Sequence, residues 1–198
     1  MNSGQRILEC ALNELVRVGA ADFSLRAVAV AAGITPMAIY RHYRNREELL
    51  FAVGEAAFSA WLRRVEAINE SEDVDWLRQA GQAYIEFALD DPARFDACFV
   101  MQTRVERLYP ADFEAGLSPV ISIVTRRIAA AQAQGNLAAG NPLELALFYW
   151  AQLHGLALLH RSGRFAMQRD AFLALASRSF DQILKSLKAG GYAPENRT

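Results

Sequence analysis

The stretch GITPMAIYRHYRNREEL, residues 33–49, decides how the first part of this chain is expected to fold. Gly33 favours a turn, because glycine adopts positive φ angles at little cost. Thr35 is a predicted N-cap and Pro36 the first helical residue, where the N–H that proline lacks would have no helical partner. The helix reaches about Tyr43 and ends in a cluster of Tyr, Arg and His side chains. So short and polar a helix predicts a role outside the hydrophobic core.

A second short helix precedes this turn. Ser24 is its predicted N-cap, and residues 25–31 are rich in alanine, so that another helix can cross close above them. Ile34 is expected to fill the junction between the two helices. Two short helices joined by a glycine-containing turn predict a helix-turn-helix, whose second helix enters the major groove of DNA.

The predicted roles of the side chains follow from their chemistry. Thr35, Met37 and Ala38 are candidates for base contacts, since methyl and thioether groups suit the thymine methyl group. The cationic and phenolic side chains that follow supply donors for phosphates, and the helix-start N–H groups at Ser24 and Asn45 can do the same. The residues predicted to bind DNA are Ser24, Arg26, Thr35, Pro36, Met37, Ala38, Tyr40, Arg41, His42, Arg44 and Arg46. A small three-helix subdomain with a solvated polar edge is the alternative.

Charge is distributed unevenly along the chain. The 198 residues carry a net charge of −1, yet residues 1–46 hold six arginines against three acidic residues. A basic end on an acidic body is expected to turn one face toward a polyanion. Together with the glycine turn and the shift in composition, this asymmetry favours DNA binding.

The rest of the chain shows helical periodicity and no convincing alternation of a strand. We predict an all-α fold of about nine helices, with an irregular stretch at 104–116. Asn45 and Glu48 have the spacing of a capping box that starts a long helix. The expected domains are a helix-turn-helix DNA-binding domain at 1–46, a helical effector-binding and dimerisation domain at 47–190, and a frayed tail at 191–198.

Several classes of function are not favoured. The sequence has no nucleophile elbow, phosphate loop or paired carboxylates beside a histidine, so an enzyme is not expected. His154 and His160 would lie on different faces of a helix, which predicts no metal site, and no cofactor is expected. Cys10 and Cys98 are isolated and suit buried thiols better than a disulfide. Polar residues interrupt the most apolar segment, residues 143–159, so we expect no membrane span and a cytoplasmic protein.

Two segments resemble the DNA-binding domain of the TetR family of transcriptional regulators: RILECALNELVRVGA at 6–20 and FSLRAVAVAAGITPMAIYRHYRNREELL at 23–50. The resemblance implies a turn at Gly33 and a recognition helix at residues 35–43. It also implies contacts with the DNA backbone from Tyr40, His42 and Arg46.

The segment WAQLHGLALLH, residues 150–160, resembles a WHG-type C-terminal domain found in part of that family, through Trp150, His154 and Gly155. The resemblance implies that the C-terminal helices dimerise. Independently, the helix at 143–159 is apolar on nearly all sides, so one face needs a partner beyond its own chain. We expect a two-fold homodimer, with a core helix of a monomer as the alternative. The predicted interface residues are Phe148, Gln152, Leu156, Leu159, Phe172, Phe180, Ile183 and Leu187.

A surplus of aromatic residues in the middle helices predicts a cavity for a small molecule. Its expected lining is largely apolar, which suits a hydrophobic or aromatic effector. His154 has two interpretations. The functional one is a hydrogen bond to an effector or a pH-sensitive contact. The other, which we favour, is a core histidine that bonds to a neighbouring helix. The predicted pocket residues are Trp76, Tyr84, Phe87, Phe95, Phe99, Phe113, Trp150 and His154.

These features predict a ligand-responsive transcriptional regulator. We expect a repressor that binds a palindromic operator in double-stranded DNA as a homodimer and is released by a small hydrophobic effector. A helical adaptor or effector-binding protein without DNA binding is the alternative. The set of Tyr40, His42 and Arg46 argues against that alternative.

Overall fold

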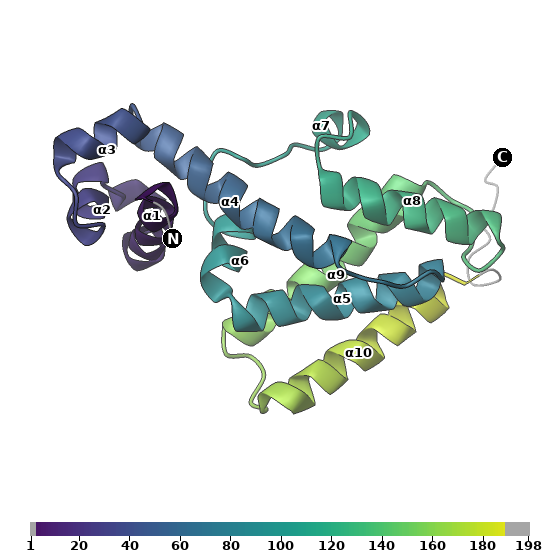
Figure 1. Ribbon diagram of the computed structural model, residues 1–198. Coiled ribbons are helices and arrows are strands. Elements are labelled where there is room, and N and C mark those ends of the chain that lie inside the picture. The colour runs from purple at the N-terminus through teal and green to yellow at the C-terminus, as the bar shows by residue number, and fades with distance from the viewer. Residues whose placement is uncertain (1–2, 189–198) are drawn as a thin grey trace. The chain divides into compact units, whose positions relative to one another are not determined.

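The structure is a computed structural model that describes residues 3–188. All regular secondary structure in this range is α-helical, which confirms the predicted all-α class. The helices (Figure 1) are α1 Ser3–Asp22, α2 Leu25–Ala31, α3 Pro36–His42, α4 Arg46–Glu66, α5 Asp73–Asp90, α6 Pro92–Phe99, α7 Ala111–Glu114, α8 Pro119–Ala133, α9 Pro142–Arg161 and α10 Arg169–Ser186. The predicted tail at 191–198 lies outside the described residues.

One helix more than the predicted nine occurs among the described residues. It is α7, which has only four residues and lies in the stretch expected to be irregular. A single turn is too short for a 3.6-residue period to appear in the sequence. Gly116 follows with a positive φ of 72°, which ends this turn.

The described chain divides into two compact units. The first contains the residues up to Arg63 together with Asp90–Glu106, and the second contains Arg64–Leu89 together with the residues from Arg107 onward. The division by contacts therefore falls within α4 and assigns α6 to the first unit. The domain boundary after residue 46, which rests on composition and motif, stays a prediction.

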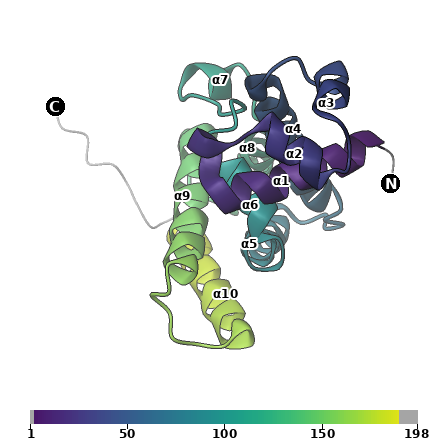
Figure 2. The ribbon, with the colours of Figure 1, turned by 90° about the vertical axis from the view of Figure 1, so that its left-hand side faces the viewer.

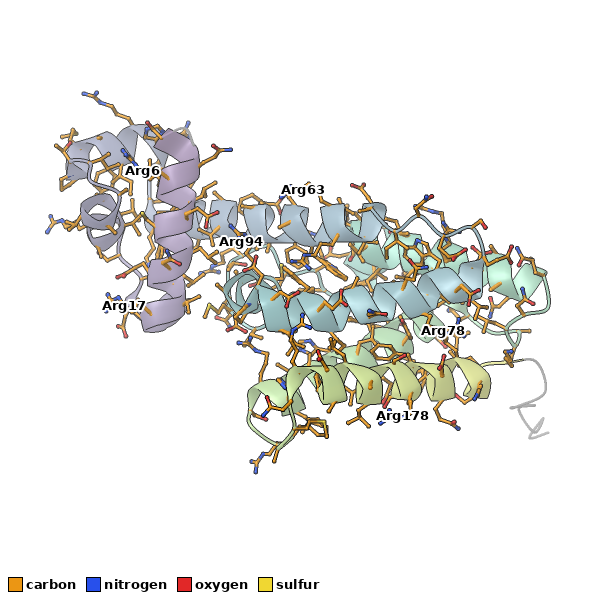
Figure 3. The ribbon with its side chains drawn as sticks, turned by 60° about the horizontal axis from the view of Figure 1, so that its bottom comes forward. Arg6, Arg17, Arg63, Arg78, Arg94 and Arg178 are labelled. Atoms are coloured by element: carbon orange, nitrogen blue, oxygen red, sulfur yellow. The ribbon has the colours of Figure 1, made fainter. Side chains whose placement is uncertain are left out.

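In the first unit, α1 packs against both α2 and α6, and α2 packs against α3. Figure 2 turns α1, α2 and α3 toward the viewer. Their core consists of fully buried apolar side chains, among them Ile7, Leu15, Val28, Ile39 and Phe95. Arg94, labelled in Figure 3, adds polar contacts by donating hydrogen bonds from α6 to Glu9 of α1 and to Asp91.

A glycine on α4 permits a close approach within the first unit. A Cβ atom placed on Gly54 would lie 2.5 Å from Thr103 Oγ1 and 2.7 Å from Val105 Cγ2. Thr103 is fully buried, and its hydroxyl donates to the backbone oxygen of Ala97 at 3.2 Å. The segment after α6 therefore packs directly against the backbone of α4 at Gly54.

In the second unit, α5, α8, α9 and α10 surround a core of large aromatic side chains. Gly81 of α5 leaves room for the hydroxyl of Tyr149 on α9, which donates to the backbone oxygen of Leu77. Arg78 of α5, labelled in Figure 3, donates to Asp181 of α10 at 2.6 Å. These contacts join α5 to both of the last two helices.

Among the helices that the structure describes, each is too short or too polar to cross a membrane.

Candidate DNA interface and C-terminal body

The two helices of the predicted helix-turn-helix form with the predicted bounds. Gly33 has a φ of 65°, and its N–H donates to the backbone oxygen of Val30 at 3.1 Å. Ile34 N–H then donates to the backbone oxygen of Ala29 at 3.0 Å. A residue with a Cβ atom would be strained at this φ, which explains the glycine at the turn.

The first turn of α3 is held by its cap. Thr35 Oγ1 accepts a hydrogen bond from Ala38 N–H at 3.2 Å, and Pro36 occupies the first helical position. Ile39 is fully buried and fixes the inner face of α3 against α2. Met37, on the outer face, is 70% exposed. The N-terminal end of α3 therefore presents a threonine, a proline and a thioether to solvent.

The residues predicted to bind DNA fall into two classes of exposure. Ser24, Ala38 and Arg46 are half-buried. The exposed residues are Arg26, Thr35, Pro36, Met37, Tyr40, Arg41, His42 and Arg44. Ser24 stands at the N-cap of α2, but its side chain makes no capping hydrogen bond there. All of them lie in the first unit, on α2, on α3 or on the residues that flank these helices.

Arg46 differs from the other arginines of this set. Its Nε donates to the backbone oxygen of Phe23 at 3.1 Å, and its Nη2 donates to that of Ala21 at 3.2 Å. Its Nη1 donates to Glu47 at 3.3 Å. No local signal in the sequence indicates these contacts, because the two backbone acceptors lie far upstream in the chain.

Sequence reasoning missed one exposed residue of this region. Val30 of α2 is 76% exposed, although it sits in an apolar helix. Leu25, Val28 and Ala29 form the buried face of that helix, and the helical period places Val30 on the opposite face, one turn after Arg26. The helical period of α2 therefore indicates that Val30 is exposed beside Arg26, although Val30 is not among the residues predicted to bind DNA.

A polar cluster joins α5 and α9 inside the second unit. Trp150 Nε1 donates to the Tyr84 hydroxyl at 3.1 Å, and that hydroxyl lies 2.8 Å from His154 Nδ1. Because an indole N–H can only donate, the hydroxyl accepts from Trp150 and can donate its own hydrogen to His154. In that arrangement Nδ1 accepts, and a neutral His154 carries its proton on Nε2. Burial lowers the pKa of His154, which favours the same neutral form.

The other predicted pocket residues are not part of this cluster. Phe95 and Phe99 pack against each other with tilted rings in the first unit, their centroids 5.1 Å apart. Trp76 and Phe87 are buried, and each lies under an arginine guanidinium at 5.2 Å, from Arg127 and Arg64 respectively. Phe113 is half-buried and packs edge-on against Tyr109. The eight predicted residues thus occupy several environments.

An open groove of about 340 Å³ lies elsewhere in the second unit, between the end of α4 and the outer face of α5. Its side chains are mostly amide or charged, in contrast to the predicted apolar lining. It is lined by Arg64, Ala67, Ile68, Asn69, Gln79, Gln82, Ala83 and Glu86.

The predicted dimer residues divide into surface and core. Phe148, Gln152 and Leu159 are exposed on α9. Leu156, Ile183 and Leu187 are half-buried. Phe172 and Phe180 are fully buried within the chain itself, where Phe172 packs on His160 and Phe180 lies against Gly81. These two side chains belong to the core of this chain, and the predicted interface stays a prediction that the exposed residues of α9 carry.

Among residues 3–188, no group of three or more His, Cys, Asp and Glu side chains is placed to hold a metal ion.

Two family profiles match the sequence. Residues 7–53 match the profile described as "Bacterial regulatory proteins, tetR family". Residues 77–187, more than half of the chain, match the profile described as "Tetracyclin repressor-like, C-terminal domain". The second match contains Trp150, His154 and Gly155, the residues of the WHG resemblance. No curated protein matches the chain with significance.

Solved structures share the fold over nearly the whole chain. A protein of unknown function from Rhodococcus sp. RHA1 is 26% identical, with a TM-score of 0.74 over 94% of this chain and 96% of its own. The repressor MexZ of Pseudomonas aeruginosa is 21% identical, with a TM-score of 0.72 over 96% of each chain.

AibR, solved with isovaleryl coenzyme A and operator DNA, is 18% identical, with a TM-score of 0.69 over 90% of this chain and 97% of its own. At such identities MexZ and AibR are similar to this chain in fold. The two profile matches establish more: this chain belongs to the tetR family of bacterial regulatory proteins, and it is a transcription regulator rather than an enzyme.

Proposed function

We propose that this regulator is a repressor that acts in the cytoplasm, binds a palindromic operator as a homodimer and is released by a small hydrophobic effector. The observation that carries the proposal is the start of α3, which is capped by Thr35, anchored by buried Ile39 and exposed at Met37. A helix held at its base and open at its N-terminal end suits insertion into a major groove.

The side chains that follow suit the DNA backbone. Tyr40, Arg41, His42 and Arg44 are exposed along the outer side and end of α3. Phenolic and cationic donors at such positions can bind phosphates on either side of the groove, and these contacts orient a reading helix without specifying sequence. Base preference would then come from Thr35, Met37 and Ala38, since their methyl and thioether groups suit thymine methyl groups.

A homodimer is supported by the free face of α9. Phe148, Gln152 and Leu159 are exposed there with the spacing of one helix face, and Gly155 lies between them. An apolar stripe of this kind suits the same stripe of a second copy around a two-fold axis. One short helix makes few base contacts, whereas two helices about 34–36 Å apart can read an inverted repeat.

A small-molecule effector is supported by the second unit and by one structural neighbour. AibR was solved with both a coenzyme A thioester and operator DNA, so this fold accommodates a small molecule together with DNA. In this chain the cluster of Tyr84, Trp150 and His154 places hydrogen-bonding groups among the buried aromatic side chains of α5 and α9, where a small molecule could engage them. A ligand that prefers one conformation of this unit would shift DNA affinity by linkage.

A gel-shift titration tests the proposal. The purified protein is mixed at low salt with duplex fragments of the promoter region beside its own gene, and the same fragments are then titrated at rising salt. We expect a retarded complex whose affinity falls steeply with salt, because phosphate contacts release counterions. Absence of binding at low salt would reject the repressor and favour the adaptor. Raised thermal stability with members of an apolar compound library would support the effector.

A further inference from the structure

We propose that Arg46 is a positioning residue, which closes the helix-turn-helix at its base instead of neutralising a DNA phosphate. The inference rests on the proposed DNA binding and assigns a role within it. It departs from the role that the family resemblance implies for Arg46, and it is drawn from the contacts of this guanidinium.

The guanidinium of Arg46 bridges two ends of the chain. Residues 24–45 contain α2, the turn, α3 and the connection to α4. Arg46 follows this segment directly, and its Nε and Nη2 donate to Phe23 and Ala21, which precede it, at 3.1 and 3.2 Å. One side chain thus ties the entry of the helix-turn-helix to its exit.

The acceptors explain why an arginine stands here. Phe23 is buried, so its backbone oxygen needs a partner within the protein. The two acceptors are reached by two different nitrogens of one planar fork, a geometry that the single ammonium group of lysine cannot reproduce. The donors are charged, which makes these hydrogen bonds stronger than neutral ones.

The start of α4 is fixed by further bonds around Arg46. Asn45 Oδ1 accepts from Glu48 N–H at 2.8 Å, and Glu48 Oε2 accepts from Arg44 N–H at 2.7 Å. The predicted capping box is therefore modified, because the glutamate reaches the residue before the cap. With both of its ends held, the segment 24–45 has little freedom to change the angle at which α3 is presented.

Arg44 provides a matched comparison, because it lies two residues away and is exposed in the connection between α3 and α4. A phosphate contact and a positioning contact differ in one measurable quantity, the slope of log affinity against log salt. Each phosphate contact contributes about −0.9 to this slope for duplex DNA. Loss of a positioning contact lowers affinity at every salt concentration and leaves the slope unchanged.

The experiment compares the full-length protein with Arg46→Gln, Arg46→Lys and Arg44→Gln, on a promoter fragment that the unmodified protein binds. Fluorescence anisotropy gives affinity at several salt concentrations, and circular dichroism shows that each variant is folded at the temperature used. We expect the slope of log affinity against log salt to be less steep by about 0.9 in Arg44→Gln, because one phosphate contact is lost. Both Arg46 variants are expected to keep the slope, bind about tenfold more weakly and melt at a lower temperature.

Two results would overturn the positioning role. One is a slope reduced by about 0.9 in Arg46→Gln, and the other is unmodified affinity in Arg46→Lys, which keeps the charge but loses the fork. If Arg46→Gln does not fold, Arg46→Lys alone decides between the two roles. Failure of the proposed function is separate, because the unmodified protein would then bind none of the promoter fragments.

Discussion

Single residues in this chain act through neighbours that are remote in sequence. Burial lowers the pKa of His154, whose Nδ1 lies 2.8 Å from the Tyr84 hydroxyl. Gly54 and Gly81 make room for side chains of other segments. A single substitution can remove the titratable ring of His154 or fill the space beside Gly54 or Gly81. The consequences at this scale are therefore testable by stability measurements alone.

Neutral His154 makes the stability of the second unit depend on pH. Its folded pKa lies below the unfolded value of about 6.5, so the unfolded chain takes up a proton first as the pH falls. The contribution to stability is complete above pH ~6.5 and is lost as the pH falls from there through the folded pKa. Chemical unfolding at several pH values should show this loss in the unmodified protein and a smaller one in His154→Asn. Equal pH dependence in both proteins would contradict the assignment.

Gly54 and Gly81 are predicted to tolerate no added methyl group. In Gly54→Ala the Cβ would approach Thr103 Oγ1 to 2.5 Å, and in Gly81→Ala it would approach the Tyr149 hydroxyl to 2.4 Å. Overpacking of this kind costs about 1–3 kcal/mol. Gly140→Ala is the control, since a Cβ there makes only ordinary contacts, 3.8 Å from Leu145 Cδ1 and 4.0 Å from Gln132 Nε2, and Gly140 lies outside the proposed interface. Thermal unfolding should show losses in the first two variants alone, and an equal loss in the control would contradict the steric account.

At the scale of helices, the sequence predicts the features that depend on residues close together in the chain, such as helix starts and caps. Such local features are the helix at 25–31, the start of α3 at Pro36, and the caps at Thr35 and Asn45. The contacts of Arg46, the assignment of α6 to the first unit and the burial of Phe172 depend on segments far apart in sequence. Periodicity shows that a helix has an apolar face, but it does not show which segment covers that face.

The cap of α3 gives a prediction at this scale. Thr35→Ala removes the side-chain acceptor for Ala38 N–H and should lower the free energy of unfolding by about 1 kcal/mol. Ser24→Ala is the matched control, because the Ser24 side chain makes no capping hydrogen bond to α2. Urea unfolding monitored by circular dichroism distinguishes the two variants. An equal loss in both, or no loss in Thr35→Ala, would show that the cap does not hold α3.

At the scale of the whole molecule, the account requires two copies of the chain. The exposed stripe on α9, which includes Phe148 and Leu159, is the surface proposed for their contact. In a two-fold interface, a charge introduced on this stripe is buried in both copies, so two charges lose their water when the dimer forms. This cost disfavours the dimer.

Phe148→Arg and Leu159→Arg are therefore expected to convert a dimer into a monomer in sedimentation velocity experiments. Leu108→Arg is the control, because Leu108 is 71% exposed but lies in the loop before α7, outside the proposed interface. It should sediment as the unmodified protein does. A monomeric unmodified protein, or loss of the dimer in Leu108→Arg alone, would reject the α9 interface.

Selection of bound duplexes from a random DNA pool tests most directly the central claim that α3 reads base pairs as part of a dimer. The account predicts enrichment of an inverted repeat whose half-sites are centred about 10–10.5 base pairs apart, or a multiple of that spacing. It also predicts that Met37→Gln changes the preferred bases in both half-sites, whereas Arg44→Gln weakens binding without changing them. No enriched sequence, or the same base preference in Met37→Gln as in the unmodified protein, would contradict the claim.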